Sequence, residues 1–264
     1  MTIHLLGTGA SVSDVDRTTT MLAFEEAEQF FLVDCGADAA RELARAELDP
    51  TRLEAIVLTH EHPDHVSGFA LLIEKMWLLG RREPIPVYGP ASAIQVAQTC
   101  FGAYATDRWE GLPAREYHEI PMASGELVFE TDAFRVTSSP VDHPVPTVGL
   151  RVETTSGAIA AYSADTAKVD AVVDLARGAS VLVHEATGHL PGVHASAEEA
   201  AETARDAGVD RLLLVHIPPG CSDDDLVTAR SIFPHTSWGH DGQAVSVQSS
   251  EAAPLAPEAR SIPL

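Results

Sequence analysis

Residues 59–65 read Thr-His-Glu-His-Pro-Asp-His and follow directly on the short apolar run 55–58, which has the length of a buried strand. A loop at the end of a strand can direct several side chains to one point. Imidazole nitrogens and carboxylate oxygens are ligands that Zn²⁺ accepts. Neither packing nor solvation requires three histidines and an aspartate within six residues. The stretch therefore predicts a metal site with His60, His62, Asp64 and His65 as candidate ligands.

Three more candidate ligands stand just after other strand-like runs. His143 follows the run 134–138, Asp165 follows 158–162, and His216 follows 212–215. A site assembled by the fold takes its ligands from the ends of several strands, as this pattern would provide. Taken singly, each of the three is equally well explained as a turn residue, but together with the 59–65 cluster they indicate one shared site.

The chain alternates short apolar runs with stretches that carry apolar residues at helical spacing. Residues 126–152 instead read as consecutive strands joined by turns, so a purely parallel sheet does not fit. We predict an α/β domain over residues 1–248, with two mixed β-sheets and outer helices, and a tail without periodicity over 249–264. The helices are expected at 37–48, 68–79, 91–101, 168–176, 196–207 and 223–232.

The order of these motifs resembles the metallo-β-lactamase superfamily, and within it the branch of tRNase Z and related phosphodiesterases. The resemblance rests on the 59–65 motif together with Leu-Gly-Thr-Gly at 6–9, Val-Asp-Cys-Gly at 33–36, Tyr-Ser-Ala-Asp-Thr at 162–166 and His-Glu-Ala-Thr at 184–187. It implies a four-layer αββα sandwich that binds two divalent metal ions. Zn²⁺ is the expected metal, while Mn²⁺ and Fe²⁺ suit the same ligands.

The resemblance also implies a division of the ligands between the two ions. One ion would be held by His60, His62 and His143, the other by Asp64, His65 and His216, with Asp165 bridging.

A bridging aspartate favours a two-metal hydrolase over an antibiotic-resistance enzyme. The expected nucleophile is a hydroxide shared by the two ions, and Asp64 is a catalytic candidate because it is placed to orient or deprotonate that water. Asp34 and Thr59 are candidates for fixing the tautomer of an imidazole, but each is equally well explained as a turn cap.

Two later segments resemble loops that frame the active site in enzymes of the tRNase Z type. His194 stands just before a helix that Ser196 is placed to cap, and a helix N-terminus beside an imidazolium can hold a phosphate and protonate its leaving oxygen. We therefore take His194 and Glu185 as catalytic candidates. The alternative for His194 is a solvent-facing histidine at the helix entry, and the case for His189 is weaker.

Two features depart from a tRNA-processing enzyme. The arm that grips RNA in many tRNase Z enzymes lies between the positions of His143 and Asp165, and only 21 residues separate them here. The formal net charge of −22 would also repel a polyanion at long range. We expect a small phosphodiester substrate and regard long RNA as disfavoured.

Several alternatives to this function stay open at this stage. They are a lactonase or thioesterase on the same fold, a tRNA 3′-processing endoribonuclease, and a non-catalytic metal-stabilised binding module.

Composition adds expectations about the environment of the protein. No apolar run approaches the length of a membrane span, no secretory signal is visible, and the three cysteines have no metal-type spacing. We expect a cytoplasmic protein with free thiols. Its acidity fits either a high-salt environment or an ordinary acidic surface. The resemblance alone implies a homodimer.

Overall fold

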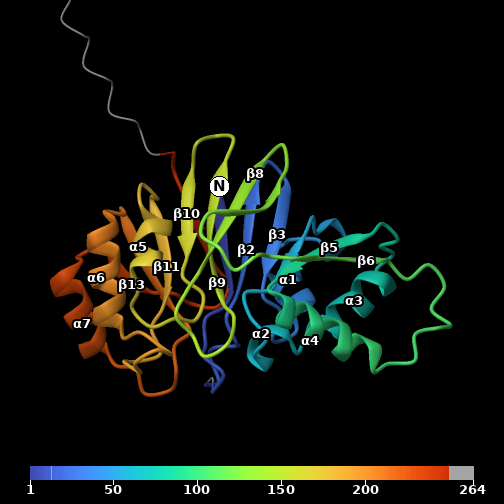
Figure 1. Cartoon of the computed structure of the whole chain (residues 1–264), viewed down its shortest axis with the longest axis horizontal. Coiled ribbons are helices and arrows are strands. Elements are labelled where there is room, and N and C mark those ends of the chain that lie inside the picture. Colours follow the sequence, from blue (N-terminus) through green and yellow to red (C-terminus); the bar gives the residue numbers. More distant parts are fainter. Residues whose placement is uncertain (13, 250–264) are drawn as a thin grey trace, which may run out of the picture.

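The computed structural model describes residues 1–12 and 14–249 as two seven-stranded β-sheets with helices outside them (Figure 1). The first sheet has the order β14-β1-β2-β3-β4-β5-β6 and the second the order β13-β12-β11-β10-β9-β8-β7. In the first sheet the strands are β1 (Thr2–Gly7), β2 (Met21–Glu26), β3 (Gln29–Val33), β4 (Ile56–Val57), β5 (Ile85–Gly89), β6 (Arg115–Glu119) and β14 (Gln243–Ser246). In the second they are β7 (Glu126–Glu130), β8 (Phe134–Pro140), β9 (Val148–Thr154), β10 (Ile159–Tyr162), β11 (Val181–Glu185), β12 (Arg211–Val215) and β13 (Thr236–Trp238).

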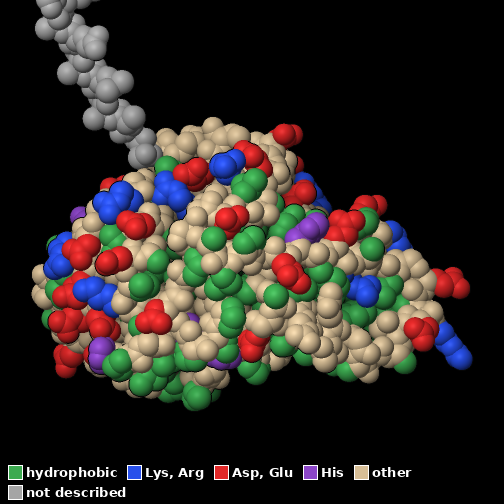
Figure 2. Space-filling model, viewed as in Figure 1, with side chains coloured by type: hydrophobic (Ala, Val, Ile, Leu, Met, Phe, Trp, Pro, Cys, Tyr) green, Lys and Arg blue, Asp and Glu red, His purple; other side chains and the backbone are tan. Residues whose placement is uncertain are grey.

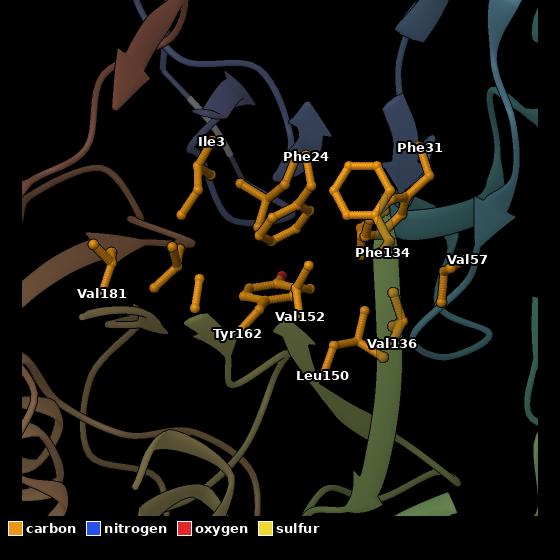
Figure 3. Packing of buried hydrophobic residues seen from close by; sticks show 14 of the residues in the cluster. Ile3, Phe24, Phe31, Val57, Phe134, Val136, Leu150, Val152, Tyr162 and Val181 are labelled. Carbon is orange, nitrogen blue, oxygen red and sulfur yellow. The ribbon is translucent and has the colours of Figure 1, made fainter. Parts of the chain in front are cut away.

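The inner faces of the two sheets pack on each other and form the central core. Figure 3 shows Phe24 and Phe31 of the first sheet facing Phe134, Leu150 and Tyr162 of the second. The ring of Phe31 stacks on Phe24 and meets Phe134 edge to face, each with a centroid distance of 5.2 Å. Burying one such side chain stabilises the fold by roughly 1.5–3 kcal/mol, so this core fixes how the two sheets sit against each other.

The helices form the two outer layers of the sandwich (Figure 1). The helices on the first sheet pack against its outer face in one apolar cluster, and the helices on the second sheet pack against that sheet in another. The described helices are α1 (Ala39–Arg45), α2 (Pro63–Val66), α3 (Phe69–Leu78), α4 (Ala91–Gly102), α5 (Asp170–Ala176), α6 (Ala197–Ala207) and α7 (Asp223–Ile232), with a 3₁₀ turn η1 at Pro50–Arg52.

The predicted αββα sandwich is confirmed, including the consecutive antiparallel strands β7–β9. Two local expectations differ from the structure. The helix expected at 37–48 spans only Ala39–Arg45. It begins at Ala39 because the Asp38 side chain caps its N-terminus at the amide of Arg41. The loop that carries the metal motif at 59–65, called the metal-motif loop below, also contains a short helix, α2, which the sequence pattern did not predict.

Gly36 lets the loop after β3 pass directly beneath α2. A Cβ atom on this residue would lie 1.6 Å from the carbonyl oxygen of Asp64. We predict that Gly36→Ala lowers the free energy of unfolding by about 3 kcal/mol, since the backbone of the metal-motif loop would have to move. Urea denaturation measures the effect. Gly102→Ala, where a Cβ meets open space, is the matched control and is expected to leave stability nearly unchanged. Equal stability of both variants would contradict this packing.

Two observations concern the molecular surface and the chain end. No helix among residues 1–12 and 14–249 is long and apolar enough to cross a membrane. On the face in Figure 2, basic side chains are interspersed with acidic ones. The predicted tail begins at Ser249, which pairs with Ala158, and its remaining residues lie outside those described.

Candidate metal centre

Strand direction places the candidate ligands along one edge of the sandwich. Strands β10, β11 and β12 are parallel, and β8 runs in the same direction because β9 is antiparallel to both β8 and β10. Their carboxyl ends therefore meet, and they lead into His143, Asp165, Glu185 and His216. Strand β4 of the first sheet leads to His60 in the same way, and in Figure 1 α2 lies at this edge.

One group of donors consists of three histidines. Nδ1 of His62 lies 3.1 Å from Nε2 of His60 and 3.2 Å from Nε2 of His143. A single ring nitrogen can form only one hydrogen bond, so hydrogen bonding does not account for both contacts. Ligand atoms about 2.0–2.1 Å from a tetrahedral zinc ion lie roughly 3.3 Å apart, which matches this spacing.

A second group adjoins the first. Nε2 of His216 lies 3.4 Å from a carboxylate oxygen of Asp64, and Nε2 of His65 lies 3.5 Å from the same oxygen. Asp165 stands between the two groups: its Oδ2 is 3.2 Å from His216, 3.5 Å from His65 and 3.8 Å from His60. The residues predicted from sequence as ligands are thus brought together, in the arrangement expected of two adjoining sites.

The other nitrogen of each of four imidazoles has a hydrogen-bond partner. The Asp34 carboxylate accepts a hydrogen bond from Nδ1 of His65 at 2.8 Å. It also accepts one from the Thr59 hydroxyl at 2.8 Å, and the oxygen of that hydroxyl lies 3.0 Å from Nδ1 of His60. In the same way, the Val193 carbonyl lies 2.9 Å from Nδ1 of His143, and the Thr187 hydroxyl 2.6 Å from Nδ1 of His216. Protons on these Nδ1 atoms leave each Nε2 lone pair free for a metal.

Burial and charge act against each other on the ionisable groups of the site. Burial and the neighbouring His65 lower the pKa of His60 well below its usual range, so its neutral form is favoured. Burial would raise the pKa of Asp165, but the charges of His216 and His65 outweigh it and hold that pKa well below its usual range. These directions favour neutral imidazole at His60 and carboxylate at Asp165, whereas burial of His65 is outweighed by Asp165 and Asp34, which raise its pKa, so a metal ion would displace a proton there.

Buried polar atoms provide a separate test of whether a metal fits. Nε2 of His65 and Oδ1 of Asp165 are buried and have no hydrogen-bond partner among the described residues. An unpaired buried polar group costs about 1–3 kcal/mol, and a metal ion would satisfy both atoms. The donor set therefore fits divalent metal ions.

The backbone near the site is strained at three positions. Asp34, Ala164 and His216 have φ angles of 62°, 53° and 54°, in the left-handed region that non-glycine residues rarely adopt. Each lies at or next to a residue of the site. Such strain costs about 1–3 kcal/mol, persists only where neighbouring contacts hold it, and clusters at functional sites.

His194 and Glu185 form a pair beside the donors. Nδ1 of His194 lies 2.9 Å from the Glu185 carboxylate, which is fully buried and also accepts the amides of Thr166, Thr187 and Ala195. Burial lowers the pKa of His194, but the hydrogen bond and charge of Glu185 outweigh it and raise that pKa above its usual range. The imidazole stacks on His216 with a ring-centroid distance of 5.5 Å, so it borders the candidate metal ligands.

Other sequence candidates lie apart from this centre. His189 is exposed and pairs with Glu199 at 2.7 Å, which favours a surface role. Sequence reasoning assigned no role to Val193 or to the Thr187 hydroxyl. A backbone carbonyl such as that of Val193 leaves no signal in the sequence, whereas the His-Glu-Ala-Thr motif did contain Thr187.

A two-sheet αββα sandwich with histidines and aspartates gathered along one edge of the sandwich is typical of a class of metal-dependent hydrolases. Residues 29–217 match the family model described as the beta-lactamase superfamily domain. The chain belongs to this superfamily.

Similar proteins indicate to which branch of the superfamily the chain is related. A ribonuclease Z of Methanothermobacter thermautotrophicus is 29% identical, with 96% of this chain and 99% of the relative covered. Human tRNase Z, short form, superposes with a TM-score of 0.77 at 22% identity, covering 94% of this chain and 99% of that one. A diphosphatase from the PhnP family gives 0.73 at 20% identity, covering 93% and 97%. The ribonuclease Z relative supports a tRNase Z-like hydrolase and does not favour a lactonase, a thioesterase or a non-catalytic module, and the two solved structures share the fold.

Proposed function

We propose that this protein is a phosphodiesterase that holds two divalent ions and hydrolyses small phosphodiesters. The observation that carries the proposal is the set of overlapping histidine and aspartate clusters at the shared edge of the two sheets. The ribonuclease Z relatives supply the bond class, since a ribonuclease cleaves phosphodiesters. Zinc is the preferred metal, with manganese and iron as alternatives.

The two ions would divide the donors between them. When bound, two such ions acidify a water molecule and neutralise charge on the phosphoryl oxygens. Asp165 would lie between the ions. The first ion would be held by His60, His62 and His143, and the second by Asp64, His65 and His216.

The remaining chemistry would fall to side chains that hold or move protons. Asp64 retains 12% of its side-chain exposure, and its carboxylate would orient the attacking water. His194, whose pKa is raised by the hydrogen bond and charge of Glu185, would donate a proton from Nε2 to the leaving oxygen. Glu185 would act as a positioning residue, because its carboxylate is fully used by His194 and three backbone amides.

The connection from His143 to Asp165 supports a small substrate. After His143 the chain passes through β9 and β10 to Asp165, and β8 pairs with β9 up to Pro140–Val148. No arm projects between these two residues. The ribonuclease Z alignment extends over 312 positions, more than the 264 residues of this chain, so that relative carries inserted residues. The formal net charge of −22 also disfavours a long polyanion.

We predict that the purified protein contains close to two metal ions per chain and hydrolyses bis-p-nitrophenyl phosphate. Its kcat/KM for a nucleoside 2′,3′-cyclic phosphate should exceed that for precursor tRNA by about tenfold or more, because a long RNA loses favourable phosphate contacts on an acidic surface. Elemental analysis and initial rates test both statements. Preferred cleavage of precursor tRNA would replace the small-substrate proposal. Loss of all metal by a folded and active protein would overturn the mechanism.

A further inference from the structure

Asp241 lies outside the metal centre, on the segment that joins β13 of the second sheet to β14 of the first. Its Oδ1 accepts a hydrogen bond from the Thr8 hydroxyl at 2.7 Å, and its Oδ2 accepts one from the Thr18 amide at 2.6 Å. The Arg17 guanidinium donates to the same Thr8 hydroxyl at 2.5 Å and to the Gly239 carbonyl at 2.6 Å. The side chain of Thr8 is fully buried. These contacts tie the loop after β1 to the crossover between the sheets.

The backbone around Thr8 continues this connection to a candidate metal ligand. The Thr8 carbonyl accepts from the amide of Ile217 at 3.0 Å, and the Ala10 amide donates to the Ile217 carbonyl at 3.2 Å. Gly9 pairs with Ile217 as an isolated β-bridge. Ile217 directly follows His216, whose φ of 54° requires neighbouring contacts to hold it. Residues 8–10 therefore support the backbone that directs the His216 imidazole.

We propose that Asp241 is a positioning residue that, through Thr8, sets His216 against the ligands of the opposite sheet. This inference rests on the proposed function. The second ion would take Asp64 and His65 from the loop after β4 of the first sheet, but His216 from the end of β12 in the second. A metal site tolerates displacements of only a few tenths of an ångström, so the distance between these two sheet ends must be fixed.

The proposal predicts a selective effect on metal binding. Loss of the Asp241–Thr8 hydrogen bond should weaken the ion held by Asp64, His65 and His216. The ion held by the three-histidine group should be spared, because none of these contacts involves its ligands. Residues that orient ligands typically change metal affinity about 10- to 100-fold.

Isothermal titration of chelator-stripped protein with Zn²⁺ tests this directly. Thr8→Val keeps the shape of the side chain but removes the hydroxyl, and should weaken the second Zn²⁺ about 10- to 100-fold while the first binds as in the wild type. Thr8→Ser keeps the hydroxyl and should restore the wild-type isotherm. Wild-type affinities in Thr8→Val would overturn the proposal. So would an equal weakening of both ions together with a lower unfolding temperature, which marks a general structural role.

A second pair of variants separates geometry from charge. Asp241→Ala should reproduce the selective loss. Asp132→Ala removes the same charge at an exposed residue that has no side-chain hydrogen bond among those described, and should change neither affinity. Equal effects of the two variants would contradict positioning. Because no substrate is used, a wild type that binds two ions but cleaves no phosphodiester leaves this inference standing and refutes only the substrate class. A wild type that binds one ion contradicts both.

Discussion

Replacing Asp165 with asparagine is expected to reduce kcat/KM for bis-p-nitrophenyl phosphate at least about 1,000-fold and to remove most of the bound metal. The carboxylate lies within 3.8 Å of ring nitrogens of His60, His65 and His216, and its side chain is 2% exposed. An amide of the same shape has no charge to bridge two cations. Its NH₂ group would also present hydrogens to those nitrogens.

Asp142→Asn is the matched control for this prediction. Asp142 is exposed near the same edge, its side chain has no hydrogen bond among the described residues, and the substitution removes the same charge. Kinetics and elemental analysis of both proteins give the answer. Full metal content and activity in Asp165→Asn would show that this aspartate does not bridge the ions. Equal losses in the two variants would indicate that overall charge, and not ligation, is responsible.

The clustering of the candidate ligands and the fold could be predicted from the sequence for the same reason. Each candidate ligand directly follows a strand-like apolar run, and the strand ends then fix where His143, Asp165 and His216 must meet. The alternation of strand and helix patterns likewise defined the layers. Short α2 was missed because a four-residue helix has no amphipathic period to detect.

The residues that orient the candidate ligands were harder to predict from the sequence. Asp34 and Thr59 had equally good interpretations as turn caps, and only their distances to His65 and His60 show that they hold the imidazoles. Val193 acts through a carbonyl that every residue possesses. Asp241 lies 25 residues beyond His216 with no motif between them, so only the tertiary structure shows that it reaches Thr8.

His194→Ala is expected to have a large effect only on substrates with a poor leaving group. If His194 protonates the leaving oxygen, an alkyl or nucleoside alcohol should lose about 10²–10⁴ in kcat. p-Nitrophenolate leaves without a proton, so hydrolysis of bis-p-nitrophenyl phosphate should fall by about tenfold or less. The loss in kcat is measured with a phosphodiester whose leaving group is methanol and compared with the loss for bis-p-nitrophenyl phosphate. Metal content should stay unchanged. If His194 were instead a metal ligand with Asp165 and His216, the substitution would lower the metal content and reduce both rates equally.

The pH profile gives a further readout of the same role. An acid must be protonated to act, so the rate should fall as the pH rises through the pKa of His194, which Glu185 raises. Glu185→Gln removes the charge that raises it, and the alkaline limb of the kcat profile for the methyl substrate should then move to lower pH. If His194 acted as a base instead, the rate would rise with pH through its pKa, and Glu185→Gln would move that acidic limb to lower pH. An unmoved limb would show that Glu185 does not set the pKa of His194. Its buried carboxylate would then serve only to accept the amides of Thr166, Thr187 and Ala195.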